Sequence, residues 1–270
     1  AQGIAAQRPF YFDHVAGLTD QAMKEWGDLT GRYYSRASGY RLEDAEYVMA
    51  GQGSVVPNLE VVADYLRENE GIKVGVMNIT MFRPFPADLI TGMLAGKKAV
   101  TIFERTDQPL AADPPLLREI RAAMTQGMEN WKAEKNNSNG AGGRMDRAVP
   151  FPGLAAVDPH SVPDFYSAGF GFGSRDLQPG DMISAARNML PDGRGFRQYY
   201  LGIDFIRKGT RLPKLQIWQE QLLEAYPKIA DLALESAGDF NLLPKGATSL
   251  RRHSVAGWGA LTIGNNLTPP

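Results

Sequence analysis

Apolar residues in the first half of the chain follow two alternating patterns, one typical of buried strands and one typical of helices that pack on one face. Glu46–Ala50 is a short apolar strand candidate, and the turn Gly51–Ser54 follows it. The next stretch predicts a helix, because apolar residues recur there at i, i+3, i+4 and i+7: Leu59, Val62, Ala63 and Leu66. Pro57 suits the first turn of this helix, and Gly71 lies where it should end.

The same succession of strand, turn and helix then repeats. Ile72–Met81 is the second strand candidate, Phe82–Pro86 is the turn after it, and a short helix follows that should end at Gly96. The apolar run Ala99–Phe103 is a third strand, which ends at Glu104. Strands and helices that alternate at this spacing favour right-handed crossovers. The pattern therefore predicts an α/β fold with a mainly parallel sheet flanked by helices.

The pattern weakens in the middle of the chain and then resumes. After a predicted helix at Pro115–Met124, the polar run Lys132–Arg147 has Gly and Asn between its charges. This run cannot bury enough apolar surface to belong to a core, so we expect an exposed loop. Beyond it, Tyr166–Gly173 is strand-like, Pro179–Leu190 predicts a helix, and Gln198–Asp204 predicts a further strand.

The two ends of the chain are patterned differently from the middle. A helix is predicted near Asp20–Trp26 and another around Leu215–Tyr226, which Pro227 interrupts. His253–Val255 is a strand candidate that would open a second α/β domain. We divide the chain into a connecting segment, a core domain, a linker and the start of a second domain: residues 1–44, 45–208, 209–250 and 251–270. The first residues carry neither an initiator Met nor a signal pattern, so we expect a section of a longer protein.

Composition removes several classes of function from consideration. The chain contains no cysteine, which excludes disulfides, thiolate zinc sites and cysteine-ligated iron–sulfur clusters within these residues. Its three histidines, His14, His160 and His253, show no metal-ligand spacing, so we predict no metal site; magnesium held by acidic oxygen ligands is the alternative that this count leaves open. A net charge of −1 argues against nucleic acid or an anionic membrane as partner. No apolar run approaches the roughly 20 residues needed to span a bilayer.

In a mainly parallel sheet, binding groups collect at the carboxyl ends of the strands. Here those ends are Gly51–Ser54, Phe82–Pro86 and Glu104–Asp107. The first of them closes a strand and opens a helix, a geometry that could cradle a phosphate. Pro57 follows where backbone donors would be wanted, however, and this favours a structural turn.

Charged residues at these ends have both a functional and a structural interpretation. Arg83 could reach an anion or a neighbouring domain, but a sole arginine in a proline-stiffened turn is more often paired with a carboxylate. Glu104 and Arg105 could suggest acid–base chemistry, but adjacent strand residues point to opposite faces. Separate salt bridges are therefore favoured for these two, and we predict no catalytic residue in the chain.

The best candidate for a ligand-binding site lies near the last residues. Gly257 and Gly259, with Gly264 beyond them, permit close approach of the backbone to a ligand after a strand. Thr262 and Asn265 could donate hydrogen bonds to the same ligand. A plain tight turn is the alternative interpretation of this segment.

Several short motifs connect the chain with one enzyme family. Lys73–Val76 followed by Phe82–Pro86 resembles the segment KVGxLxxRxFRPFP of the second core domain of pyruvate:ferredoxin oxidoreductases and their 2-oxoacid relatives. Further landmarks follow in the family's order: Leu29–Tyr33 is similar to LTGRxY, Ala45–Val48 with Gly51–Ser54 to AExVIVxxGS, Glu104 and Arg105 to LDR, Gly171–Pro179 to YGLxSxxFTP, and Leu201–Asp204 to VGIxDD. Arg252–Val255 with Gly257–Gly259 resembles the opening HSxGGWGxxTxGKNL of the family's gamma-type domain.

The resemblance implies an enzyme that oxidatively decarboxylates a 2-oxoacid on thiamine diphosphate, held with magnesium. Electrons pass through iron–sulfur clusters to ferredoxin or flavodoxin, and the acyl group goes to coenzyme A. Residues 45–208 would be a transketolase C-terminal-like core domain II, and residues 251–270 the start of the gamma-type domain. The family's thiamine site lies in other domains under a Gly-Asp-Gly signature that this chain lacks. We therefore expect a structural and interdomain section that binds no cofactor wholly by itself and is inactive alone.

The resemblance also implies ligands and partners. Through the gamma-type domain, coenzyme A would approach Gly257, Gly259, Thr262 and Asn265. Partners would be the other domains or subunits of the same oxidoreductase and, through the complete enzyme, ferredoxin or flavodoxin; we expect a homo-oligomer in the cytoplasm. Two departures weaken ligand contacts: Asp107–Pro115 lacks the glycines of the family's KEPGxxGEPL, and Asn265 stands where a Lys is common.

Two other classes of protein fit part of the pattern. One is the carboxy-terminal domain of a transketolase or of a 2-oxoacid dehydrogenase beta subunit, which would use NAD through a lipoyl partner. That class fits the strands and helices but does not account for the ending at His253–Gly259. The other is a non-enzymatic α/β binding or assembly module, which the missing catalytic signatures permit.

Overall fold

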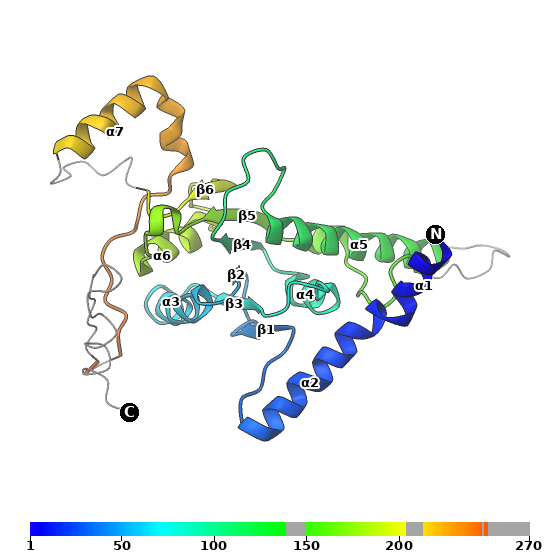
Figure 1. The fold of residues 1–270 in the computed structure, drawn as a ribbon. Coiled ribbons are helices and arrows are strands. Elements are labelled where there is room, and N and C mark those ends of the chain that lie inside the picture. Colours follow the sequence, from blue (N-terminus) through cyan, green and yellow to red (C-terminus); the bar gives the residue numbers. More distant parts are fainter. Residues whose placement is uncertain (139–148, 204–212, 245, 248–270) are drawn as a thin grey trace. The chain divides into compact units, whose positions relative to one another are not determined.

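The computed structural model describes residues 1–138, 149–203, 213–244 and 246–247. It divides the chain into two compact units, residues 1–240 and 241–270. The first unit contains every helix and strand discussed below (Figure 1). The boundaries proposed from sequence at residues 45, 209 and 251 stay predictions.

A six-stranded sheet organises the first unit, with the spatial order β1-β3-β2-β4-β5-β6. Its strands are β1 (Ala37–Tyr40), β2 (Tyr47–Gly51), β3 (Val74–Ile79), β4 (Ala99–Glu104), β5 (Asp164–Gly169) and β6 (Gln198–Tyr200). Strands β3, β2, β4, β5 and β6 run parallel, and β1 pairs antiparallel with β3 at one edge. The predicted mainly parallel α/β sheet is confirmed.

Helices cover both faces of this sheet (Figure 1). Helices α3 (Val55–Glu70) and α6 (Pro179–Asn188) contact each other on one face, and α4 (Ala87–Leu94) and α5 (Pro115–Ser138) contact each other on the other. The apolar positions that predicted α3 are fully buried: Leu59, Val62, Ala63 and Leu66. Each buried Leu or Val side chain of this set stabilises the fold by about 1.5–3 kcal/mol. The helix ends at Gly71, whose positive φ of 67° suits glycine.

The polar run Lys132–Arg147 is not a loop along its whole length. Helix α5 continues from the predicted Met124 to Ser138, so the loop prediction is wrong for residues 132–138. A partner distant in sequence contacts the helix just before this run: the Asn130 amide donates to the carbonyls of Phe151 and Leu154 at 2.8 and 3.0 Å, and its oxygen accepts from the Phe151 N–H. Residues 139–148 of the run lie outside the described part of the chain.

The amino-terminal segment contains more structure than its sequence pattern predicts. Helix α1 (Gln2–Phe10) and a short 3-10 turn precede helix α2 (Val15–Thr30), which is longer than the predicted helix. Strand β1 also lies in this segment and pairs Ala37 with Ile79. With four residues, one of them glycine, β1 has no recognisable alternation of its own, and its pairing with β3 defines it.

At the other end of the unit, Pro227 interrupts a helix as predicted. Helix α7 (Pro213–Ala225) ends before it, and the 3-10 helix η4 (Pro227–Leu232) follows. Ala233 then forms a parallel bridge with Tyr200 at the end of β6, so this part of the predicted linker extends the sheet.

Candidate functional site

The order of the strands places a switch point beside β2. The chain leaves β2 through α3 to reach β3 on one side, and it returns through α4 to β4 on the other side. In open sheets of this type, ligands bind in the crevice outside the carboxyl ends of the strands at such a point. The segments found there are Gly51–Ser54 after β2 and Arg105–Asp107 after β4.

The turn Gly51–Ser54 has the geometry of a structural connection. A Cβ atom on Gly51 would lie 2.9 Å from the Val55 side chain, because α3 begins immediately after the strand and packs closely on it. Gly53 has a φ of 68°, and its carbonyl accepts a hydrogen bond from the Val56 N–H at 3.1 Å. The glycines are explained by tight packing and turn geometry, which agrees with the structural interpretation of this sequence.

Glu104 does not form the salt bridge that its sequence position favours. Its side chain is buried at the end of β4, and its two carboxylate oxygens accept hydrogen bonds from the backbone N–H groups of Leu116 and Leu117, at 2.7 and 3.2 Å. These groups belong to the first turn of α5, which Pro115 opens. Burial raises the pKa of the Glu104 carboxyl, and the two backbone hydrogen bonds oppose this shift. The residue is a cap that fixes α5 to the sheet.

Arg83 pairs with a carboxylate, as the structural interpretation predicts. Its guanidinium bonds to the Glu119 carboxylate of α5 at 2.9 Å and to the Phe82 carbonyl at 2.9 Å. It also lies over the Phe82 ring, 4.2 Å from the ring centroid. The contact attaches the turn after β3 to α5. The Arg83–Glu119 ion pair lies at the surface, where the Arg83 side chain is 59% exposed.

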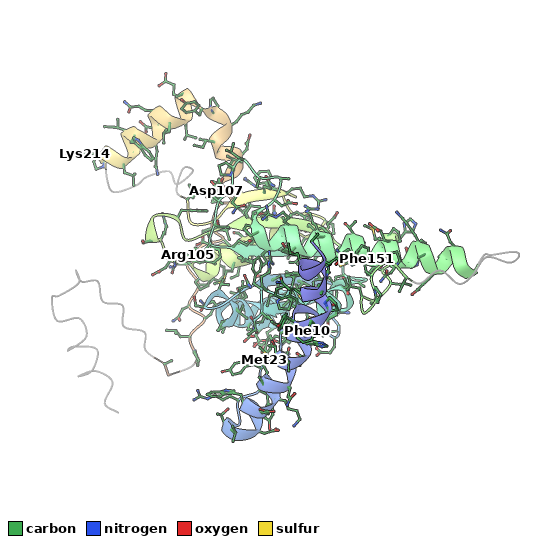
Figure 2. All side chains as sticks on the ribbon, turned by 45° about the vertical axis from the view of Figure 1, so that its right-hand side comes forward. Phe10, Met23, Arg105, Asp107, Phe151 and Lys214 are labelled. Carbon is green, nitrogen blue, oxygen red and sulfur yellow. The ribbon has the colours of Figure 1, made fainter. Side chains whose placement is uncertain are left out.

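A small polar hollow lies at the carboxyl ends of β4, β5 and β6. Its volume is about 110 Å³, and the loop after β4 closes one side of it; Arg105 and Asp107 of this loop are marked in Figure 2. Its lining comes from this loop, from strands β5 and β6 and from η4: Thr106, Asp107, Gln108, Pro109, Ala111, Pro114, Ser167, Gly169, Gln198, Tyr199, Tyr200 and Leu232. Pockets that enclose a drug-sized ligand measure about 300–1,000 Å³, so this hollow is too small for a nucleotide-sized cofactor.

Two tyrosines set the chemistry of this hollow. The Tyr200 hydroxyl donates to the Asp107 carboxylate at 3.0 Å, and burial together with this acceptor raises the pKa of the phenol. The buried Tyr199 hydroxyl lies 3.4 Å from the Thr101 hydroxyl, and burial raises the pKa of this phenol as well. Both phenols therefore stay protonated at neutral pH. Tyr200 holds the loop after β4 against the sheet, Tyr199 contacts strand β4 itself, and neither phenol provides a base for proton transfer.

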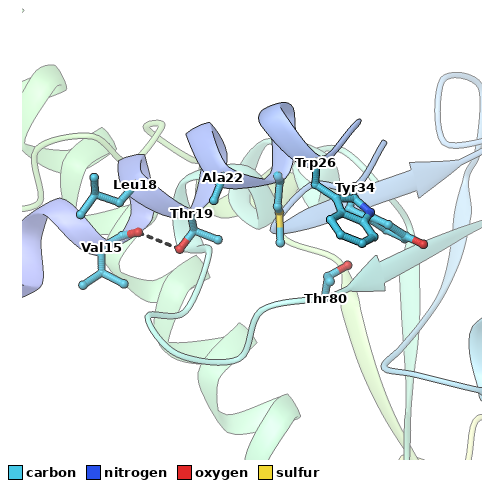
Figure 3. A pocket seen from close by; sticks show the side chains of 8 residues that line it. Val15, Leu18, Thr19, Ala22, Trp26, Tyr34 and Thr80 are labelled. Carbon is cyan, nitrogen blue, oxygen red and sulfur yellow. Dashed lines mark hydrogen bonds between the residues drawn. The ribbon is translucent and has the colours of Figure 1, made fainter. Parts of the chain in front are cut away.

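A second hollow, apolar and larger, lies along helix α2 (Figure 3). Its volume is about 660 Å³, and its lining combines one face of α2 with two residues from the segments that flank β1 and β3: Val15, Leu18, Thr19, Ala22, Met23, Trp26, Tyr34 and Thr80. None of these side chains is charged. The Thr19 hydroxyl already donates to the Val15 carbonyl at 2.8 Å. The hollow has the size of a ligand site but lacks the convergent polar groups that orient a small ligand.

The four residues predicted to bind a ligand, Gly257, Gly259, Thr262 and Asn265, lie outside the described residues. Their role stays a prediction. The Tyr200–Asp107 pair and the α2 hollow were not predicted. The pair joins residues 93 positions apart, which no local pattern indicates. The apolar spacing of α2 could have predicted an apolar face on this helix. It could not have predicted whether the rest of the chain covers that face.

Within the described residues, no three His, Asp or Glu side chains gather as metal ligands would. No helix among them is long and apolar enough to cross a bilayer.

Comparison with known proteins identifies one stretch of the chain. Residues 45–148 match the family model described as pyruvate:ferredoxin oxidoreductase core domain II. The matched stretch begins just before β2 and includes β2 to β4 with helices α3, α4 and α5. It therefore contains the switch point and the Glu104 cap.

Curated relatives share this stretch. The chain is 36% identical over 125 residues to pyruvate synthase subunit PorA of Thermotoga maritima, covering 43% of this chain and 31% of the relative. It is 26% identical over 195 residues to pyruvate-flavodoxin oxidoreductase of a Nostoc species, covering 72% and 14%. It is 37% identical over 84 residues to ketoisovalerate oxidoreductase subunit VorA of Pyrococcus horikoshii, covering 30% and 21%. The chain thus spans at most about a third of the length of these relatives.

Proposed function

We propose that this chain is a structural section of a larger enzyme of the pyruvate:ferredoxin oxidoreductase family that oxidises 2-oxoacids, because its residues 45–148 match the family's core domain II. The observation that carries this proposal is the match of residues 45–148 to core domain II. The groups at the sheet's carboxyl edge support a structural role, because Glu104, Arg83 and Tyr200 are each occupied in holding loops and helices to the sheet.

In this proposal, the complete enzyme decarboxylates a 2-oxoacid on thiamine diphosphate, transfers the acyl group to coenzyme A and passes two electrons to ferredoxin or flavodoxin. The relatives are named for pyruvate, ketoisovalerate and flavodoxin, which supports a 2-oxoacid as substrate and a small electron carrier as acceptor. Family resemblance further supports a homo-oligomer in the cytoplasm, in which this section contacts other domains or subunits.

The chain has no cysteine, and the residues that the structure describes offer no magnesium ligand set, so two cofactors of that reaction lack ligands here. Without cysteine the chain supplies no thiolate to an iron–sulfur cluster. The described residues gather no acidic or histidine ligand set for magnesium. We therefore assign the thiamine, magnesium and cluster sites to parts of the enzyme outside this chain.

Coenzyme A is the cofactor to which this chain would contribute. The proposed contacts are Gly257, Gly259, Thr262 and Asn265, since glycines after a strand admit a ligand close to the backbone. Gly259→Val should then lower coenzyme A-dependent turnover of the complete enzyme more than coenzyme A-independent carbon dioxide exchange. An equal loss of both activities with unchanged folding would assign the glycines to a plain turn.

The proposed function is tested with the purified parent enzyme that contains this section. Pyruvate, 2-oxoglutarate and ketoisovalerate are offered with coenzyme A, and reduction of ferredoxin or flavodoxin is followed by absorbance. We expect oxidation of at least one 2-oxoacid that requires coenzyme A, and none by the 270-residue chain alone. Oxidation that instead requires NAD and a lipoyl partner would favour a dehydrogenase, and no oxidation with any acceptor would favour a non-enzymatic module.

A further inference from the structure

Helix α2 presents an apolar face that the described part of this chain does not cover. Figure 3 shows the residues that line this hollow. We call it the α2 groove and define it by Leu18, Ala22, Met23 and Trp26 of α2 together with Tyr34. Leu18 is 62% exposed and Trp26 is 51% exposed. Within the helix only Gly27 is buried, where the Tyr33 ring packs against it.

The apolar surface continues past the start of α2. A second open hollow of about 570 Å³ adjoins the α2 groove and shares Leu18 with it. It adds Phe10 and Tyr11, which are 71% and 61% exposed and pack edge to face, with ring centroids 4.8 Å apart. Asp13 and His14 also line this second hollow, so the apolar surface has a polar margin. Exposed apolar surface rimmed by polar residues is typical of a protein-binding site.

The α2 groove is held in place by a buried ionic clamp. The Arg36 side chain, 7% exposed, donates to the Asp20 carboxylate of α2 at 2.8 Å and to both carboxylate oxygens of Asp88 in α4, at 2.9 and 2.6 Å. Its carbonyl accepts hydrogen bonds from the Thr80 and Met81 N–H groups at 3.0 Å each. One residue therefore fixes α2 to α4 and to the end of β3. The groove is preformed, which lowers the entropic cost of filling it.

We propose that the α2 groove docks an apolar surface from another domain or subunit of the same oxidoreductase, in the part that lies outside this chain. This inference rests on the proposed function. The chain spans 31% of the PorA relative and 14% of the flavodoxin-dependent one, so most of the polypeptide of such an enzyme is available to cover it. The groove-lining side chains are uncharged, and an apolar protein surface is the partner that satisfies them.

Site-specific photo-crosslinking in the assembled enzyme tests the occupant. A benzophenone side chain is introduced in place of Ala22, inside the groove, and as matched control in place of Gln21, its exposed neighbour on the polar side of α2. We expect position 22 to cross-link to peptides outside residues 1–270 and position 21 to give few products. Products from position 22 that join two copies of this chain, identified by isotope mixing, would overturn the proposal, as would equal yields from both positions.

A charge inserted at the same place gives a second readout that does not depend on a bulky probe. Ala22→Glu and Gln21→Glu each add one negative charge on adjacent exposed positions of the same helix turn. In the assembled enzyme, Ala22→Glu should lower the unfolding midpoint of this section by at least about 3 °C more than Gln21→Glu, because the charge is buried on docking. In the 270-residue chain alone Ala22→Glu should melt no lower than Gln21→Glu, because Gln21→Glu loses the hydrogen bond from Gln21 to the Glu25 carboxylate at 2.8 Å.

Equal shifts for the two variants in the assembled enzyme would contradict docking at the groove. This failure is distinguishable from failure of the proposed function. If the enzyme oxidises 2-oxoacids normally but gives neither cross-links nor a difference in unfolding midpoint, docking at the α2 groove is contradicted and the proposed function is not.

Discussion

Helices α2 and α3 are alike in sequence pattern and opposite in burial. Each has 16 residues, each carries a stripe of apolar side chains, and each ends at a glycine with φ near 70°, Gly31 at 73° and Gly71 at 67°. Helix α3 buries six apolar side chains against the sheet and α6, whereas α2 buries Gly27 alone.

The difference shows that an amphipathic pattern reports that a face will be covered, but not which part of the protein covers it. The apolar stripe of α3 is covered by the strand that precedes it and the strand that follows it. The helix is attached to α4 through the Arg36 clamp, while its own apolar stripe stays open within the described residues. The same local signal thus stabilises the domain in one helix and offers a docking surface in the other.

The largest expected effect contrasts one leucine in the first half of each helix. Leu59→Ala in α3 should lower the free energy of unfolding of the chain by about 2–5 kcal/mol, because it leaves a cavity in a fully buried site. Leu18→Ala in α2 should change it by less than about 0.5 kcal/mol, since Leu18 is 62% exposed. Denaturant unfolding followed by circular dichroism measures both. Similar losses for the two variants would show that the α2 face is already covered in this chain.

Removal of the clamp should loosen α2 without loosening α3. Arg36→Met leaves the Asp20 and Asp88 carboxylates without their partner, and we expect a loss of about 1–3 kcal/mol because both carboxylates are partly exposed. Hydrogen exchange should quicken in α2 and stay unchanged in α3. Equal exchange in α2 of the variant and the wild type would mean that the clamp does not hold the helix.

The clamp also gives a pH dependence with a defined sign. Hydrogen bonds from Arg36 lower the pKa of the Asp88 carboxyl. The stabilisation is therefore present above the ordinary pKa of aspartate, about 3.9, and is lost as pH falls through the lowered value. The stability difference between wild type and Arg36→Met should shrink in acid, and a difference that grows on acidification would contradict the pairing.

Glu104 supplies the contrasting case on the sheet side. Glu104→Gln replaces one acceptor of the α5 N–H groups by a donor, and we expect a loss of about 1–2 kcal/mol at neutral pH. Because burial raises the folded-state pKa of Glu104, its contribution is fully present below the ordinary glutamate pKa of about 4.3 and falls as pH rises through the raised value. The advantage of wild type over the variant should therefore grow as the pH is lowered toward 4.3. Unfolding curves at several pH values decide the sign.

The smallest expected effect concerns the exposed pair that joins the turn after β3 to α5. Arg83→Ala should cost about 0.5–1 kcal/mol, since the Arg83 side chain is 59% exposed and such pairs contribute little. Glu119→Ala should cost about the same, and the double variant no more than either. A loss of activity in the complete enzyme from Arg83→Ala alone, with unchanged stability, would restore the anion-binding interpretation.

Local patterns predicted the parallel part of this fold because its helices and strands are covered by near neighbours in sequence. The spacing of Leu59 and Leu66 predicts that both side chains are buried, and both are. Features that depend on distant partners were not predictable: Asn130 donates to carbonyls more than twenty residues away, and Glu104 caps α5 through N–H groups twelve and thirteen residues away. The four-residue strand β1 is likewise defined only by its pairing with β3.

The most direct test of the account compares hydrogen exchange in α2 and α3 between the 270-residue chain and the assembled oxidoreductase. Helix α3 is already covered, so its exchange should be the same in both. Helix α2 should exchange markedly more slowly in the assembled enzyme, because the α2 groove is filled there and the opening of the helix then also requires undocking. Equal exchange of α2 in the two forms, in an enzyme that oxidises 2-oxoacids, would contradict the claim that the rest of the enzyme covers this helix.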